Sequence, residues 1–203
     1  MKYLLVVLAA YLIGCSNMAL YIAKVRKVDL KKHGSGNPGA SNAAILMGWR
    51  AGVAVAVHDI GKAWLAVFLA GLLFPQLPAV RETAGIACVL GHIFPFYMCF
   101  KGGKGFASYL GMTLALNWKF ALVMMAVVLV VTVVADYIVV GTFTTIAVVP
   151  VYFGIATHSL LAVLVLLAGS IAIFCRHWEN IRKIRAGTEI GLRSTIKKEH
   201  RVK

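Results

Sequence analysis

The amino-acid sequence predicts an all-α integral membrane protein with about seven transmembrane helices, one of them short. Of the 203 residues, 61% are hydrophobic and only 14% are charged, and the mean hydropathy is +0.85. A soluble domain of this size cannot cover so much apolar surface. Long apolar runs recur along the whole chain, and most basic residues stand beside those runs. We therefore expect one transmembrane domain over residues 1–203.

The apolar runs define the expected helices. Most approach the roughly 20 residues that a helix needs to cross about 30 Å of hydrocarbon. The fourth run does not, because at about 1.5 Å per residue it covers little more than half the bilayer. It is either a re-entrant piece or a short helix sheltered by its neighbours. In chain order the runs are Tyr3–Ala23, Ala51–Phe74, Thr83–Phe100, Phe106–Leu116, Phe120–Ala135, Ile138–Ala156 and Ser159–Cys175.

The basic residues predict the orientation of these helices. Residues 24–32 contain five Lys or Arg, and the tail from 176 to 203 contains nine. Basic segments next to membrane helices stay in the cytoplasm, so we expect both segments on that side. Six crossings between them are needed, and the short fourth run then counts as a crossing. The N-terminus is expected outside and the C-terminus in the cytoplasm, with the polar stretches 34–50, 91–106 and 176–193 at the cytoplasmic face.

Charge and cysteine content exclude other classes of protein. The net charge of +14 can indicate a nucleic-acid partner, but the basic residues flank apolar runs rather than alternating with aromatics. Membrane orientation explains them better, and no nucleic-acid partner is expected. The four cysteines lie in apolar segments without C-x-x-C spacing, which argues against a zinc site or a disulfide framework. The first run is too long for a signal peptide, so we expect a retained helix.

Two glycine-rich stretches are candidate anion sites. Phe100–Phe106 reads F-K-G-G-K-G-F, in which glycines let backbone N–H groups converge and Lys101 and Lys104 add positive charge. It lacks Walker A spacing, and the simpler interpretation is a basic cytoplasmic turn. Gly34–Asn42 reads G-S-G-N-P-G-A-S-N and precedes a helical pattern from about Ala43. A glycine turn that leads into a helix N-terminus binds anions well. The alternative is a plain loop in which Ser41 or Asn42 caps the helix.

Ionisable residues inside apolar runs are costly and mark either function or internal pairing. Asp59 and Lys62 stand at i and i+3, so we expect an ion pair on one helix face, whereas His58 points elsewhere. His92, in the sequence G-H-I-F-P, lies about one and a half helical turns before the Phe100–Phe106 stretch, and Pro95 can kink the end of its helix. A single histidine in an apolar helix is most often a hydrogen-bonded core residue.

The last apolar run ends in a polar constellation. His177 and Asn180 share a helical face at i and i+3, and Gly187-Thr188-Glu189 follows as a turn that carries a carboxylate. An imidazole and an amide can hold and deprotonate a hydroxyl group. The alternative is ordinary interfacial polarity.

These stretches resemble the motifs of the bacterial acyl-phosphate:glycerol-3-phosphate acyltransferases in order, spacing and length over nearly the whole chain. The resemblance implies a seven-helix enzyme that moves a fatty acyl group from acyl phosphate to the 1-hydroxyl of glycerol 3-phosphate. The products are lysophosphatidic acid and phosphate, and no metal, cofactor or acyl-enzyme is involved. The matching motifs are S-G-N-P-G-A-S-N (35–42), G-H-I-F-P (91–95), F-K-G-G-K-G (100–105) and H-x-x-N (177–180) with G-x-E (187–189).

The resemblance and the chemistry of the stretches together predict the site. We expect catalytic roles for His177, Asn180 and Lys104, and either His177 or a substrate phosphate oxygen acts as the base. The site is expected at the cytoplasmic face of a bacterial inner (plasma) membrane, among membrane lipids; the oligomeric state stays open. The residues expected to bind acyl phosphate and glycerol 3-phosphate, or a related polyol phosphate, are Ser35, Gly36, Asn37, Gly39, Ser41, Asn42, His92, Gly102, Gly103, Thr142 and Glu189.

Two departures from the family pattern keep other functions open. Ile45 stands where the family has an arginine, which removes a planar cation suited to phosphate. The family's serine-bearing stretch before the sixth helix reads D-Y-I-V-V-G-T here (136–142), and only Thr142 offers a hydroxyl. A divergent acyltransferase with another polyol-phosphate acceptor is one alternative. A transporter of an anionic solute, with the glycine loops at half-helix ends, is another.

Overall fold

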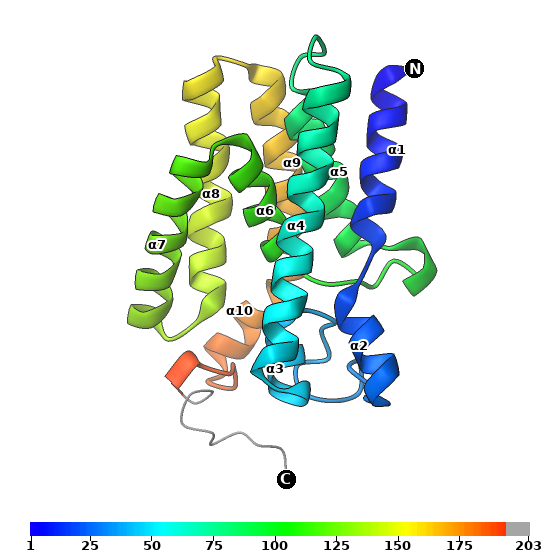
Figure 1. The fold of residues 1–203 in the computed structure, drawn as a ribbon. Coiled ribbons are helices and arrows are strands. Elements are labelled where there is room, and N and C mark those ends of the chain that lie inside the picture. Colours follow the sequence, from blue (N-terminus) through cyan, green and yellow to red (C-terminus); the bar gives the residue numbers. More distant parts are fainter. Residues whose placement is uncertain (194–203) are drawn as a thin grey trace. The chain divides into compact units, whose positions relative to one another are not determined.

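The computed structural model describes residues 1–193, and over that range its regular elements are all helices (Figure 1). The chain divides into two compact units, Met1–Leu116 and a second that begins at Asn117. The first unit contains α1 (Lys2–Cys15), α2 (Met18–Arg26), α3 (Ala40–Met47), α4 (Trp49–Leu73), α5 (Val80–Ile93), the 3-10 helix η1 (Phe96–Met98) and α6 (Phe106–Leu116). The second contains α7 (Trp118–Ala135), α8 (Ile138–Thr157), α9 (Leu160–Arg176) and α10 (Trp178–Arg185). The predicted all-α class is confirmed.

Several of these helices can cross a membrane. Lys2–Arg26, α4, α7 and α8 are long and apolar enough, and α9 with α10 makes a fifth candidate if their 44° bend is counted within one span. They correspond to five of the seven predicted runs. α6 has 11 residues and is short, as predicted. The chain is a multi-pass membrane protein, and the count of seven crossings stays a prediction.

The third predicted run differs from the observed helix. The sequence predicts a helix over Thr83–Phe100, but α5 has 14 residues and ends at Ile93. The chain then turns through η1, where the N–H groups of Met98 and Phe100 both donate to Pro95 O, at 3.0 and 3.1 Å. Pro95 has no N–H and cannot continue a helix, and hydrophobicity alone does not reveal this turn. α5 is therefore about 21 Å long, which is shorter than the hydrocarbon layer.

The first predicted run is broken in the middle. α1 ends at Cys15 and α2 begins at Met18, with the N-cap residue Asn17 accepting a hydrogen bond from Leu20 N at 3.0 Å. The hydroxyl of Tyr97 donates to Cys15 O at 2.6 Å, which satisfies one carbonyl at the break. The break is thus fixed by side chains from α2 and η1.

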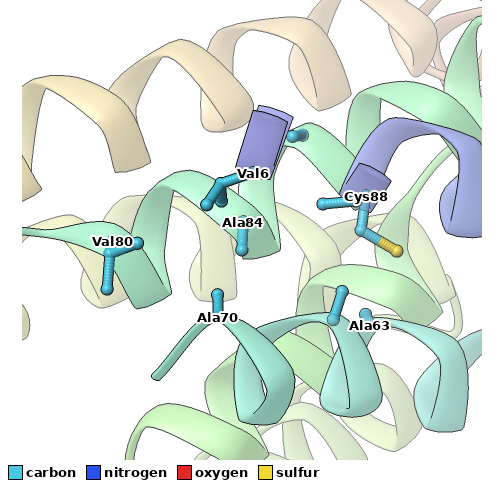
Figure 2. Packing of buried hydrophobic residues seen from close by; sticks show 9 residues of the cluster. Val6, Ala63, Ala70, Val80, Ala84 and Cys88 are labelled. Carbon is cyan, nitrogen blue, oxygen red and sulfur yellow. The ribbon is translucent and has the colours of Figure 1, made fainter. Parts of the chain in front are cut away.

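Small residues allow α1, α4 and α5 to pack closely. Figure 2 shows Val6 of α1 and Ala63 and Ala70 of α4 gathered around Ala84 and Cys88 of α5. Two glycines bring α1 and α5 nearer still. A Cβ at Gly14 would lie 2.0 Å from Cys88 O, and one at Gly91 would lie 2.1 Å from Tyr11 O. Close packing of small residues is one of the forces that associate helices in lipid, where no hydrophobic effect acts between them.

α2, α3 and α4 form a second packed group that supports the Gly34–Asn42 loop. Its members are Ala19, Ala23, Leu30, Ala43, Met47, Ala51 and Val55. The side chain of Arg26 donates to Met47 O at 2.5 Å and so satisfies a carbonyl in the last turn of α3. The loop between α2 and α3 is therefore held at both ends by helices that pack against each other.

The second unit is built on α7, α8 and α9. Phe120 of α7 stacks on Tyr152 of α8 with ring centroids 3.7 Å apart, and Asn117 donates to the Tyr152 hydroxyl at 2.9 Å. Ser170 of α9 donates to Ile146 O at 2.9 Å in α8, four residues before the helix-interior Pro150. The exposed side chains of α7 are mostly large and apolar, as expected of a helix in contact with lipid.

Candidate active site

Two asparagines hold the Gly34–Asn42 loop. Asn42 is fully buried; its Oδ1 accepts from Ser35 N at 2.9 Å, and its Nδ2 donates to Leu30 O at 3.0 Å. Asn17 donates to Pro38 O at 3.2 Å. Gly34 has a φ of 62°, a left-handed value that residues with a side chain rarely adopt. Asn42 thus shapes the loop, and its predicted direct contact with substrate stays a prediction.

The Gly34–Asn42 loop leads directly into the N-terminus of α3. This helix begins at Ala40, earlier than the predicted start near Ala43, and its N-cap is Gly39 rather than Ser41 or Asn42. Because the N-cap residue is a glycine, it has no side chain to accept a hydrogen bond from the first turn of the helix. The first-turn N–H groups and the helix dipole favour an anion at this place. The predicted binding residues Ser35 and Ser41 are exposed here, and Gly36 and Asn37 are half-buried.

The second predicted anion site, the glycine–lysine loop (Phe100–Phe106), lies against the end of α5. Gly102 N donates to Ile93 O at 3.0 Å, and Gly103 N donates to His92 O at 3.1 Å. Both glycines are buried. Lys101 is exposed and Lys104 is half-buried, which agrees with an interfacial role for the first lysine and a role in the site for the second.

A buried ionic cluster lies next to this loop. Lys62 Nζ is 2.7 Å from Asp59 Oδ1, so the predicted pair is confirmed. Lys62 Nζ is also 2.8 Å from His92 Nδ1, which places His92 in the same cluster. His58 does not point elsewhere, as the sequence suggests: its Nδ1 is 3.3 Å from Asp59 Oδ1 and its Nε2 is 2.9 Å from Ser16 Oγ. The helix break at Ser16 lets both α4 side chains reach this residue: His58 bonds to its hydroxyl, and Lys62 Nζ donates to its main-chain O at 2.7 Å.

His177 lies in the second unit, at the junction of α9 and α10. It is buried, and its Nδ1 is 2.8 Å from Ile173 O. A carbonyl oxygen only accepts, so Nδ1 carries a proton, and in the neutral form of the ring Nε2 is the acceptor nitrogen. Three residues later, Asn180 Nδ2 donates to Glu189 Oε1 at 2.5 Å. The structure thus joins Asn180 and Glu189, two of the predicted site residues.

Gly187 explains why Glu189 reaches Asn180. Gly187 has a φ of 68° and follows the C-cap Ala186 of α10. Thr188 N bonds to Lys183 O at 2.8 Å and Gly187 N to Ile184 O at 3.0 Å, the two bonds of a Schellman motif. The left-handed residue turns the chain back on the helix, and the carboxylate two positions later meets the amide. The sequence prediction of a carboxylate-bearing turn is confirmed.

Asp136 makes contacts with residues 192 and 193 that the sequence did not suggest. It caps α7, its main-chain O accepts from Leu192 N at 2.8 Å, and its Oδ1 accepts from Arg193 N at 2.8 Å. It therefore fastens the segment that carries Glu189 to the turn between α7 and α8. An acidic residue at the end of a long apolar run, in a chain with a basic tail, is the only signal for it. Thr142 is buried in the first turns of α8, where its hydroxyl donates to Ile138 O at 3.3 Å.

The predicted residues therefore fall into two groups, each described within its own unit. The first unit brings together His92, Gly102 and Gly103, and separately orders residues 34–42 at the start of α3. The second unit joins Asn180 to Glu189, next to His177. Within residues 1–193, no group of three or more His, Cys, Asp or Glu side chains is arranged to hold a metal ion.

The helices define an integral membrane protein in which two glycine-rich loops are ordered at the ends of helices. Comparison with known proteins then identifies its family. A family model described as glycerol-3-phosphate acyltransferase matches residues 4–187. The chain belongs to the glycerol-3-phosphate acyltransferase family.

Individual relatives agree over almost their full length. The chain is 35% identical to the glycerol-3-phosphate acyltransferase of Thermoanaerobacter pseudethanolicus, covering 97% of this chain and 100% of that protein. It is 32% identical to glycerol-3-phosphate acyltransferase 1 of Oceanobacillus iheyensis, covering 98% and 99%. The crystal structure of PlsY (YgiH), an integral membrane glycerol 3-phosphate acyltransferase in its glycerol 3-phosphate form, matches with a TM-score of 0.89 at 31% identity, covering 96% of this chain and 98% of that one.

Proposed function

We propose that this chain transfers a fatty acyl group from acyl phosphate to the 1-hydroxyl of glycerol 3-phosphate, which forms lysophosphatidic acid and phosphate in phospholipid synthesis. Family membership supports this activity. PlsY, whose fold this chain shares, has been crystallised in a glycerol 3-phosphate form and in a lysophosphatidic acid form. An acceptor and a product of the proposed reaction are thus bound by a protein with 31% sequence identity.

One observation in this chain carries the proposal: the glycine–lysine loop is folded onto the end of α5 with its glycine backbone buried and Lys104 half-buried beside it. The N–H groups of Gly102 and Gly103 donate to carbonyls of α5, so in this loop the partly desolvated Lys104 ammonium is the group that would bind a phosphate and neutralise its charge. An anchor at the membrane surface would not require Gly102 and Gly103 to be buried. We assign Lys104 to a substrate phosphate and the α3 N-terminus, with Ser35 and Ser41, to acyl phosphate.

We assign His177, Asn180 and Glu189, which the family resemblance implies in the site, to the glycerol end. In the proposed step the 1-hydroxyl oxygen attacks the acyl carbon, the acyl carbon–phosphate oxygen bond breaks, and inorganic phosphate leaves. The hydroxyl proton passes to His177 Nε2 or to a phosphate oxygen. The Ile173 carbonyl leaves Nε2 as the acceptor nitrogen, and the bond to Glu189 fixes the amide of Asn180. Acyl phosphate is already activated, so placement of the hydroxyl is most of the task.

The direct test incubates the purified protein in detergent with acyl phosphate and a panel of polyol phosphates, and measures lysolipid and released phosphate. We expect acceptor-dependent release of phosphate with glycerol 3-phosphate. Phosphate release that no acceptor stimulates, without any lysolipid, would contradict acyl transfer. Transport of glycerol 3-phosphate into sealed vesicles without chemistry would instead favour the anion transporter.

A related candidate, acyl transfer to another polyol phosphate, rests on Ile45. This side chain is half-buried on α3, at the position where the family resemblance implies an arginine. Arg50 does not replace it, because its guanidinium lies over the Trp49 ring at 5.5 Å. The same panel of acceptors distinguishes the two candidates.

We also propose that the chain crosses a bacterial plasma membrane seven times, with the N-terminus outside and the polar loops at the cytoplasmic face. The basic segments support this orientation. In a variant without native cysteines, a cysteine at Gln76 should react with an impermeant thiol reagent in intact cells, and one at Lys31 should not. A cysteine at Lys198, which lies outside the described residues, should also be shielded. Labelling at Lys31 would refute the proposed orientation.

A further inference from the structure

The Lys62 ammonium uses all of its hydrogen-bonding capacity inside the protein. Its three protons face three acceptors: Ser16 O at 2.7 Å, Asp59 Oδ1 at 2.7 Å and His92 Nδ1 at 2.8 Å. Lys62, Asp59 and His92 each expose only 4% of their side chains. A buried lysine whose three protons all have acceptors within the protein does not bind substrate. Its role must therefore be to position the groups that accept from it.

Lys62 fixes the proton on His92. An ammonium group only donates, so His92 Nδ1 must accept. The neutral imidazole then carries its single proton on Nε2. His92 Nδ1 is also 3.4 Å from Asp59 Oδ1, but this separation is longer than the 2.8 Å to Lys62 Nζ. The closer partner sets both the orientation of the ring and its tautomer.

The held ring forms the support of the glycine–lysine loop. A Cβ built on Gly103 would lie 2.1 Å from His92 Nε2, so the loop backbone rests directly on the Nε2 edge of the ring. The main-chain carbonyl of His92 also accepts a hydrogen bond from Gly103 N at 3.1 Å. The ring and the main chain of His92 therefore both fix the position of Gly103. This glycine directly precedes Lys104.

We propose that Asp59 and Lys62 are positioning residues of the active site, which act through His92 on the glycine–lysine loop. Asp59 keeps Lys62 charged, Lys62 orients His92, and His92 holds Gly103 so that Lys104 reaches the substrate phosphate. This inference rests on the proposed function for its effect on turnover, and on geometry alone for its effect on the loop.

A purely stabilising ion pair is the weaker interpretation of this cluster. Buried ion pairs are commonly no more stabilising than apolar pairs of similar volume, and ionisable groups within a membrane span are expensive. An apolar pair, however, cannot donate to His92 Nδ1 and to Ser16 O at once. The cluster therefore provides a directed donor, which packing alone does not supply.

The test separates stability from turnover. Lys62→Met leaves the buried Asp59 carboxylate without its lysine counter-charge, whereas the double variant Asp59→Asn/Lys62→Met removes both charges. We expect the single variant to lose thermal stability and the double variant to recover much of it. In the double variant kcat should nevertheless remain lower by on the order of 100-fold, the effect of a small misplacement in an active site. A double variant that regains both stability and kcat would overturn the proposal. Hydrogen exchange of residues 99–106 should rise in the double variant, and unchanged exchange would also overturn it.

A measurement on the parent protein covers the case in which these variants do not fold. Nitrogen-15 NMR of the histidine-labelled parent, with His92 assigned by the His92→Gln variant, reports which ring nitrogen carries the proton. We expect the Nε2–H tautomer; an Nδ1–H tautomer would overturn the role of Lys62. The exchange and NMR readouts do not depend on activity. A parent that fails to transfer acyl groups but has the expected tautomer would thus contradict only the proposed function.

Discussion

Gly103→Ala tests whether the glycine–lysine loop depends on its contact with His92. The added methyl group would lie 2.1 Å from His92 Nε2 and 2.8 Å from Cε1, and real Cβ contacts essentially never fall below 3.0 Å. The ring cannot swing away cheaply, because Lys62 Nζ holds its Nδ1 at 2.8 Å. The loop must therefore move instead, and Lys104 moves with it.

The expected loss follows from the cost of overpacking. Forcing a methyl group into a filled site costs about 1–3 kcal/mol. If the displaced loop raises the free energy of the enzyme-bound transition state by this amount, kcat/KM falls roughly 5- to 150-fold. The assay is glycerol 3-phosphate-dependent release of phosphate from acyl phosphate, with a thermal unfolding scan of each variant.

Gly61→Ala is the matched control. Gly61 lies in the middle of α4, and a Cβ there meets nothing within 4 Å. Alanine is favoured over glycine in a helix by about 1 kcal/mol, so this variant should be as active as the parent and at least as stable. If Gly103→Ala keeps the parent kcat/KM and melting temperature, the loop is not held against His92 as described.

Three further variants test other parts of the site. Lys104→Ala should lower kcat/KM by about 10- to 150-fold, because a charged hydrogen bond is worth about 1.5–3 kcal/mol. Lys101→Ala should have little effect. An equal loss in both variants would contradict the assignment of Lys104 to a substrate phosphate. Gly187→Ala should weaken the turn that brings Glu189 to Asn180 by about 1–2 kcal/mol and lower activity, and Gly187→Asn, which tolerates the left-handed conformation, should retain more activity. Ile45→Arg should lower the KM for glycerol 3-phosphate roughly 5- to 30-fold in a salt-sensitive manner, for a gain of about 1–2 kcal/mol; tight use of glycerol 3-phosphate by the parent would show that the missing arginine does not matter.

Local relationships in the sequence predicted local structure well. The pair Asp59 and Lys62 follows from i,i+3 spacing on a helix, and the turn at Gly187 follows from glycine after a polar helix. Both are confirmed by hydrogen bonds of the expected groups. In each case the partners lie within one or two helical turns, so the helix geometry alone brings them together.

The contacts between distant residues were not predictable in this way. His92 is 30 residues from Lys62, and Arg193 is 57 residues from Asp136. Their meeting depends on how helices pack, and that packing depends on small residues whose neighbours hydropathy does not identify. The end of α5 was missed for a related reason, since Phe94 and Phe96 to Met98 are apolar although the α-helix has already ended at Ile93.

The break in the first span and the ionic cluster of α4 depend on each other. Interrupting a helix within a membrane exposes carbonyl groups that lipid cannot satisfy, and each costs several kcal/mol. Lys62 satisfies Ser16 O and Tyr97 satisfies Cys15 O. A buried ammonium would be costly alone, and Asp59 supplies its counter-charge. With its third proton Lys62 then reaches His92 of α5, which ends early and supports the glycine–lysine loop. The polar groups that satisfy the broken first span in lipid are thus the same groups that fix the glycine–lysine loop. This double role explains why a chain with 61% hydrophobic residues has a lysine in the middle of α4.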